Sequence, residues 1–155
     1  MKMQQISKHI SWKEATSSPT ATQKGIVNIP NAIQVTNMKL VAENVFEPLR
    51  EWSGEPIKVN SMFRSEALNR EIGGARNSQH CSNDGSAIDL DAIGTKKNSD
   101  LFHFIKENLL FDQLIWEFGN ENQPDWIHVS FRAGNNRKQV LKAKKIDRKT
   151  KYFPF

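Results

Sequence analysis

The sequence predicts an α+β fold in which a central antiparallel sheet carries the functional residues and helices pack against it. Two observations predict this class. Helical patterns come first along the chain, and mostly short strands joined by short turns follow them. A length of 155 residues is typical of one domain and is enough to bury a core, so we expect residues 1–155 to form a single domain.

Four helices are expected from capping residues and from apolar residues that recur every three or four positions. The longest has apolar residues up to Trp52, and Pro48 inside it should kink or shorten it. Residues 17–30, which precede it, are rich in Ser, Thr, Pro and Asn and are predicted to form a surface loop. Trp12, Trp52 and Trp116 are interpreted as core residues. The helices are expected to begin near Ser11, Asn31, Ser65 and Asn98.

Strands are expected where apolar and polar residues alternate, or where short apolar runs end at turn residues. In the run 87–91, alternation puts Ala87, Asp89 and Asp91 on one face. The last strand carries lysines, which suit the edge of a sheet because charged side chains discourage pairing with other chains. The expected strands are 57–64, 87–91, 113–118, 126–131 and 139–143.

Composition restricts the classes of partner. The chain has 22 basic and 17 acidic residues and a pI near 9.4, which favours polyanions such as nucleic acid or an anionic cell wall or membrane surface. No nucleic-acid motif is present and the aromatic residues are not interleaved with the basic run, so we expect no nucleic-acid partner. One cysteine excludes an internal disulfide, and no apolar run is long enough to cross a membrane. Residues 1–7 lack the apolar core of a secretory signal, so we expect the protein to be made in the cytoplasm. We also expect it to be a monomer.

Two of the expected strands bring candidate metal ligands together. His80, which we interpret as borne on a strand, precedes a polar turn, and Asp89 lies in the alternating run that follows it. His128 lies in a second alternating run and shares a face with Trp126. Two histidines and one aspartate are the three protein ligands that a catalytic zinc takes, with the fourth position left for water.

These residues resemble a family of zinc peptidases that includes D-Ala-D-Ala carboxypeptidases, D,D-dipeptidases and phage L-alanyl-D-glutamate endopeptidases. The family pattern is S-x-H-x-x-G-x-A-x-D followed by a distant acid-x-x-H, and here it occupies residues 78–80, 85–89 and 125–128. The likeness spans nearly the whole chain and is closest to small single-domain members from phages and prophages, with a hedgehog-like and D,D-peptidase-like fold. The spacing from His80 to Gly85 is two residues longer than the pattern, which leaves Asp84 and Asp91 as lesser candidates for the metal site.

The resemblance implies that His80, Asp89 and His128 hold one zinc ion. Metal binding lowers the pKa of water from about 15.7 to about 7, which supplies hydroxide at neutral pH. Asp125 would accept the proton of this water and pass it to the leaving amine. Strict alternation puts Asp125 on the face opposite His128, so the chain would have to bend between them. The alternative for Asp125 is a turn-capping aspartate.

Two further residues, Arg64 and Ser78, receive roles beside the resemblance, and two more are interpreted from their place in a strand. Arg64, in a segment similar to the family's serine–aromatic–arginine–serine segment, would stabilise the oxyanion, and its alternative is a surface ion pair. Ser78 would bind the substrate's carboxylate or an adjacent amide. Trp126 is either a wall of the substrate pocket or a core residue. Asp91 is interpreted as orienting a ligand or facing solvent.

The leading function is therefore a zinc peptidase that cuts peptidoglycan stem peptides. The bond would be D-Ala-D-Ala or L-Ala-D-Glu, and the protein would act on the cell wall after release, as an endolysin of a phage or prophage does. The alternative is a zinc-bearing wall-binding or virion structural module without turnover, since the related hedgehog domains show that such a fold can serve binding. A retained carboxylate base favours the enzyme, because a non-catalytic site does not need one.

Overall fold

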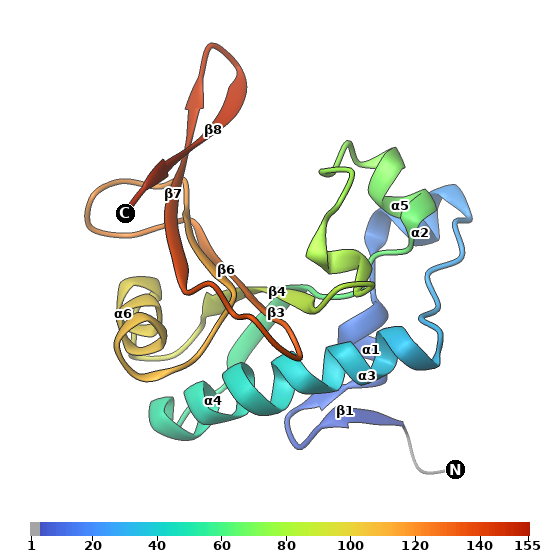
Figure 1. The fold of residues 1–155 in the computed structure, drawn as a ribbon, viewed down its shortest axis with the longest axis horizontal. Helices are drawn as coiled ribbons and strands as arrows, with labels where there is room; N and C mark the ends of the chain where they lie inside the picture. Colours follow the sequence, from blue (N-terminus) through green and yellow to red (C-terminus); the bar gives the residue numbers. More distant parts are fainter. Residues whose placement is uncertain (1–3) are drawn as a thin grey trace.

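The computed structural model describes residues 4–155 and has the α+β architecture predicted from the sequence (Figure 1). Its main sheet has six strands in the order β3-β4-β6-β5-β7-β8. All neighbours in this sheet are antiparallel except β5 and β7, which are parallel. The strands are β3 (Ile57–Ser61), β4 (Ser86–Ala92), β5 (Gln113–Glu117), β6 (Trp126–Phe131), β7 (Gln139–Ile146) and β8 (Lys149–Pro154), with β1 (Gln5–Ser7) and β2 (Ile10–Ser11) forming a separate pair.

One long helical rod runs along the base of the sheet (Figure 1). It consists of α3 (Ala32–Val41), a π-helical turn η1 (Ala42–Phe46) and α4 (Glu47–Ser53). The π turn ends two residues before the predicted kink residue Pro48, whose missing N–H and bulky ring disturb the regular hydrogen-bond pattern of an α-helix. The rod therefore continues through the proline, and its buried residues Met38, Val41, Val45, Phe46 and Leu49 belong to the main hydrophobic core.

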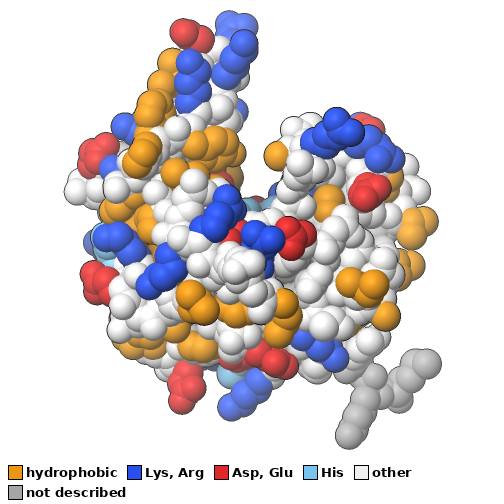
Figure 2. Space-filling model, in the orientation of Figure 1, with side chains coloured by type: hydrophobic (Ala, Val, Ile, Leu, Met, Phe, Trp, Pro, Cys, Tyr) orange, Lys and Arg blue, Asp and Glu red, His pale blue; other side chains and the backbone are white. Residues whose placement is uncertain are grey.

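The remaining helices surround the sheet. The helix α6 packs near β4, β5 and β6, and the short helices α2 and α5 lie on the far side of the molecule from β8 (Figure 1). The β7–β8 hairpin rises on one side, and Figure 2 shows a hollow between it and the α5 side. The bounds are α1 (Trp12–Thr16), α2 (Pro19–Lys24), α5 (Glu66–Glu71), the 3-10 turn η2 (Gln79–Cys81) and α6 (Asn98–Asn108).

The structure corrects several local predictions. Residues 17–30 are not only a loop, because α2 forms there with Ser18 as its N-cap and Pro19 in its first turn. The lysine-rich β7 is not an edge strand, because β8 pairs with it and takes the edge. Trp52 is not a core residue: it is 41% exposed, and its ring stacks on Phe104 with 4.3 Å between centroids.

Candidate metal centre

His80, Asp89 and His128 come together on the face of the sheet that lines the hollow. Asp89 of β4 and His128 of β6 are register partners, so their side chains share a face. The Asp89 Oδ1 atom lies 3.1 Å from His128 Nδ1 and 3.3 Å from His80 Nε2. His80 lies in the 3-10 turn η2 and not on a strand, which corrects the prediction of two histidines borne on strands.

The hydrogen bonds of His80 show that this group suits a cation. His80 Nδ1 is 2.7 Å from the Met62 carbonyl oxygen, so Nδ1 carries the proton and donates it there. His80 Nε2 is buried without a hydrogen-bond partner in residues 4–155 and faces Asp89. Burial alone would raise the pKa of Asp89, but the neighbouring imidazoles of His80 and His128 outweigh it and hold this pKa below its ordinary range. An unpartnered imidazole nitrogen beside an ionised carboxylate is the donor set that binds zinc.

The two lesser candidates, Asp84 and Asp91, are engaged elsewhere. The Asp91 carboxylate accepts hydrogen bonds from the amides of Asn60 and Asn98, each at 2.8 Å. The Asp84 carboxylate is 78% exposed and pairs with Arg132 at 3.0 Å. In the described part of the chain, the cluster with metal-ligand geometry consists of His80, Asp89 and His128.

The cluster lies at the base of a cleft of about 950 Å³. Arg64, Ser78 and Trp126, which were predicted from the sequence, all line this cleft. Arg64 donates from Nη1 to Asn69 Oδ1 at 3.2 Å, whereas its buried Nε has no partner among the described residues. Burial lowers the pKa of Arg64, and the negative charge of Asp89 opposes that change. Ser78 Oγ accepts a hydrogen bond from the His80 backbone N–H at 3.2 Å, so this side chain also shapes the turn that carries His80.

Glu117 is a cleft residue to which the sequence analysis gave no role. It ends β5, is only 8% exposed, and follows Ile115, the register partner of His128, by two positions on the same face. Burial raises the pKa of Glu117 to about 7, with the charge of His128 opposing the rise and that of Asp89 adding to it. The available signal was the charged residue at the end of an otherwise apolar strand, on the face shared by Gln113 and Ile115.

Asp125, the predicted base, lies outside this cleft. Its side chain is exposed and lines a neighbouring hollow together with Trp116, Asn120 and Glu121. Its backbone N–H donates to the Glu117 carbonyl oxygen at 2.9 Å, which holds the turn between β5 and β6. Asp125 thus belongs to the turn before β6, and it is not among the residues that line the cleft with His128.

A buried carboxylate supports the turn that carries His80. Asp112 is fully buried and accepts two hydrogen bonds from the Arg137 guanidinium, at 3.0 and 2.8 Å. It also accepts one from Gln79 Nε2 at 3.0 Å. Burial opposes ionisation of Asp112, but these hydrogen bonds outweigh burial and lower its pKa. Asp112 thus connects the residue next to His80 with β5 and with the loop before β7.

The fold and the His-Asp-His cluster define a metallopeptidase of the D-Ala-D-Ala carboxypeptidase-like class. Residues 8–130 match the family model described as Peptidase M15, and the chain belongs to that family. The resemblance seen in the sequence is thereby confirmed. Peptidase M15 members are zinc-dependent and act on peptidoglycan peptides. None of the curated proteins compared with the chain matches it. No helix in residues 4–155 has the length and apolar character needed to span a membrane.

Proposed function

We propose that this protein is a zinc-dependent peptidase that hydrolyses one amide bond in peptidoglycan stem peptides, either D-Ala-D-Ala or L-Ala-D-Glu. One observation carries the proposal. The unpartnered Nε2 of His80 faces Asp89 and His128 in the same cleft that holds the buried Glu117. Release to the cell wall as a phage or prophage lysin stays a prediction from the sequence.

Three atoms would hold the metal: Nε2 of His80, a carboxylate oxygen of Asp89 and Nδ1 of His128. When bound, zinc supplies a water with a pKa of about 7 and polarises the carbonyl that is attacked. The hydrogen bond from His80 Nδ1 to Met62 orients the ring, and the cross-strand position of Asp89 fixes its carboxylate relative to His128.

We assign the proton transfer to Glu117 and not to Asp125. A general base must reach the proton that it accepts and must have a pKa near the working pH. The Glu117 carboxylate lines the cleft, and its pKa of about 7 lets it accept a proton at neutral pH and give it to the leaving amine. Asp125 meets the first requirement less well, because it is exposed and lines the neighbouring hollow.

Arg64 would stabilise the negative charge that develops on the attacked carbonyl oxygen. Its Nε is a buried donor without a partner in the described chain, and such a donor gains most when an oxyanion forms close to it. Trp126 forms part of the wall of the cleft, and Ser78 leaves its hydroxyl proton available to a substrate carboxylate or amide.

The test is to incubate the zinc-loaded protein with purified peptidoglycan and to identify the fragments by mass spectrometry, with His80→Ala as the control. Loss of a terminal alanine identifies a D,D-carboxypeptidase, whereas new L-Ala termini identify an endopeptidase. If walls of several chemotypes stay intact while the wild type holds stoichiometric zinc, the non-catalytic wall-binding module is supported instead.

A further inference from the structure

The β7–β8 hairpin lies beyond the segment that matches the family model, yet it forms one wall of the active-site cleft. The match ends at residue 130, and the hairpin spans residues 139–154. Leu141 and Lys145 of β7 and Thr150 and Tyr152 of β8 line the same cleft as the His-Asp-His cluster. The hairpin therefore adds side chains to the site that the family match does not cover.

Strand register places Tyr152 in line with Glu117. Glu117 is the register partner of Ala143, and Ala143 is the partner of Tyr152, so the three side chains share one face in one row. Neighbouring strands are about 4.8 Å apart, which puts Glu117 and Tyr152 roughly 10 Å apart at their backbones. The Ala143 between them is buried and small, so it leaves the space above it open to the larger side chains on either side.

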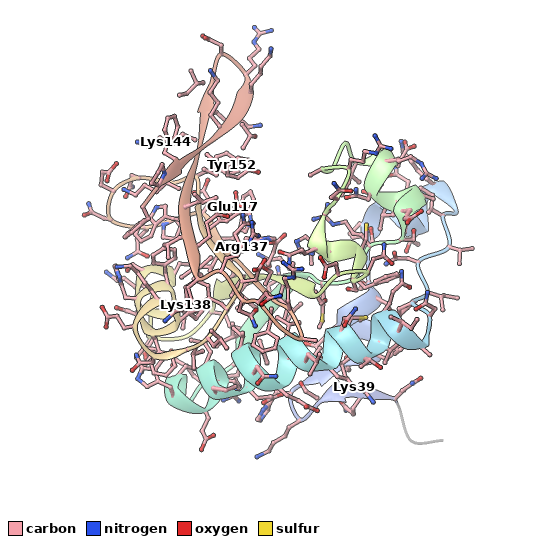
Figure 3. The ribbon with its side chains drawn as sticks, viewed as in Figure 1. Lys39, Glu117, Arg137, Lys138, Lys144 and Tyr152 are labelled. Carbon is pink, nitrogen blue, oxygen red and sulfur yellow. The ribbon has the colours of Figure 1, made fainter. Side chains whose placement is uncertain are left out.

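The pKa of Tyr152 is consistent with a position close to Glu117. Burial raises the pKa of the Tyr152 phenol, and the negative charges of Glu117 and Asp89 raise it further. In Figure 3, Tyr152, Glu117 and Arg137 follow one another along the wall formed by the hairpin and the sheet. A peptide bound over Glu117 would therefore also meet the Tyr152 ring.

Lys145 is the cleft cation whose charge is not engaged. Arg132 pairs with Asp84, and Arg137 pairs with the buried Asp112. Arg64 is assigned to the oxyanion. Lys145 Nζ donates to the neutral hydroxyl of Thr150 at 3.0 Å and lies 5.5 Å from the Phe118 ring centroid, and within residues 4–155 it has no ion pair.

The other lysines of the hairpin differ in their partners or in their faces. Lys142 and Lys144 are both close to Glu121, at 2.6 and 3.8 Å. Lys149 and Lys151 are the register partners of Ile146 and Lys144, so both lie on the face opposite to that of Lys145. Within the hairpin, Lys145 thus combines a position on the cleft with an unneutralised charge.

We propose that Lys145 and Tyr152 form a substrate-binding subsite, in which Lys145 recognises a free carboxylate of the peptide close to the scissile bond and Tyr152 packs on the peptide. This inference deepens the proposed function and rests on it. Both candidate bonds suit the subsite, because D-Ala-D-Ala ends in a carboxylate and the D-Glu residue carries one. The acidic residues that line the cleft have other partners or roles. Asp84 pairs with Arg132 and Asp112 with Arg137, whereas Asp89 is assigned to the metal and Glu117 to proton transfer.

The test compares two stem peptides that differ only in this carboxylate, which one of them carries as a carboxamide. Dissociation constants are measured in the zinc-loaded, Glu117→Gln background, so that turnover does not interfere, and KM and kcat are measured with Glu117 intact. Lys145→Gln should weaken binding of the carboxylate peptide about three- to tenfold, since the lysine is exposed, and leave the carboxamide peptide unchanged. With Glu117 intact, Lys145→Gln should raise KM for the carboxylate peptide and leave kcat unchanged.

Two matched variants complete the experiment. Lys151→Gln removes the same charge from the same hairpin on the other face and should change neither dissociation constant. Tyr152→Ala should weaken both peptides alike, because packing does not depend on the carboxylate. The inference is overturned if Lys145→Gln affects both peptides equally or if Lys151→Gln has the same effect. If the wild type cleaves neither peptide, the proposed function fails, and the dissociation constants still decide the subsite.

Discussion

Asp89 lies directly opposite His128 in the antiparallel pairing of β4 and β6, with its Oδ1 3.1 Å from the His128 Nδ1. The two residues are 39 positions apart in the sequence, so the sheet register alone brings them together. A slip of one residue would turn Asp89 towards the core face, because side chains alternate along a strand. His80 joins them from a 3-10 turn that the Met62 carbonyl holds in place.

The first prediction concerns metal binding. Wild-type protein should bind one zinc ion per chain, and zinc should raise its melting temperature by mass action. His128→Ala and Asp89→Asn should lose both effects, because each removes a ligand from a three-ligand site. Metal analysis after dialysis and thermal unfolding with and without zinc would measure this. Asp91→Asn is the control and should keep stoichiometric zinc, so loss of zinc in that variant alone would contradict the assignment.

The second prediction separates the two candidate bases. Glu117→Gln should lower kcat by about two to four orders of magnitude, since it removes the group that moves the proton, while zinc content stays unchanged. Asp125→Asn should keep kcat close to that of the wild type, because its exposed carboxylate lines the neighbouring hollow. Steady-state kinetics on the peptide identified by mass spectrometry would decide between them. The reverse result would return the role of base to Asp125.

The third prediction is a pH-dependent contribution to stability from Asp112. Its pKa is lowered in the folded protein, so its ionised form stabilises the fold above the ordinary pKa of about 3.9 and loses this effect as the pH falls through the lowered value. Asp112→Asn should therefore cost about 2 kcal/mol of unfolding free energy at neutral pH, and the difference should shrink below about pH 4. Urea unfolding of the wild type and of Asp112→Asn, at neutral pH and below about pH 4, would measure the difference in unfolding free energy.

Asp84→Asn is the matched control for Asp112, because it also removes a carboxylate paired with an arginine. The Asp84 side chain is 78% exposed, and a surface ion pair contributes little. Its unfolding free energy should stay within about 1 kcal/mol of the wild type at neutral pH. Equal losses in the two variants would show that burial does not govern the contribution of Asp112.

The fold class was predictable because the sheet residues alternate with period two and the helices start at capping residues. The strand around Asp89 and the strand around His128 were both expected, and β4 and β6 pair as the ligand cluster requires. The strand β8 was not expected, because its two lysines belong to the basic run and it ends in a proline. It becomes a strand by pairing with β7, and the sequence does not reveal that pairing.

The role that we propose for Glu117 was not predicted from the sequence, for a related reason. A motif of neighbouring residues drew attention to Asp125, which is close to His128 in sequence. Glu117 comes close to His128 through the pairing of β5 with β6, where Ile115 is the partner of His128. Phe118, with φ of +57°, and Gly119, with φ of +71°, then turn the chain away, so the strand ends with Glu117 facing the cleft.

The last prediction concerns Gly85, which begins the segment leading into β4. Its φ is +77°, and a Cβ there would lie 2.5 Å from the Phe131 carbonyl oxygen and 2.8 Å from Arg132 Cγ. Gly85→Ala should cost more than about 2 kcal/mol of unfolding free energy, because an alanine pays for the left-handed backbone and also meets a backbone atom that cannot move aside freely. Since Asp89 follows on the same strand, zinc affinity should fall as well.

Gly134→Ala is the control for Gly85, since no atom lies within 4 Å of its added Cβ and its φ is outside the left-handed region. Its unfolding free energy should change by less than about 0.5 kcal/mol, and its zinc affinity should match the wild type. Denaturant unfolding and zinc titration of both variants would measure this. A Gly85→Ala protein as stable as Gly134→Ala would mean that the start of β4 can shift without disturbing Asp89. In that case the close packing of β4 against β6 would not determine the positions of the metal ligands.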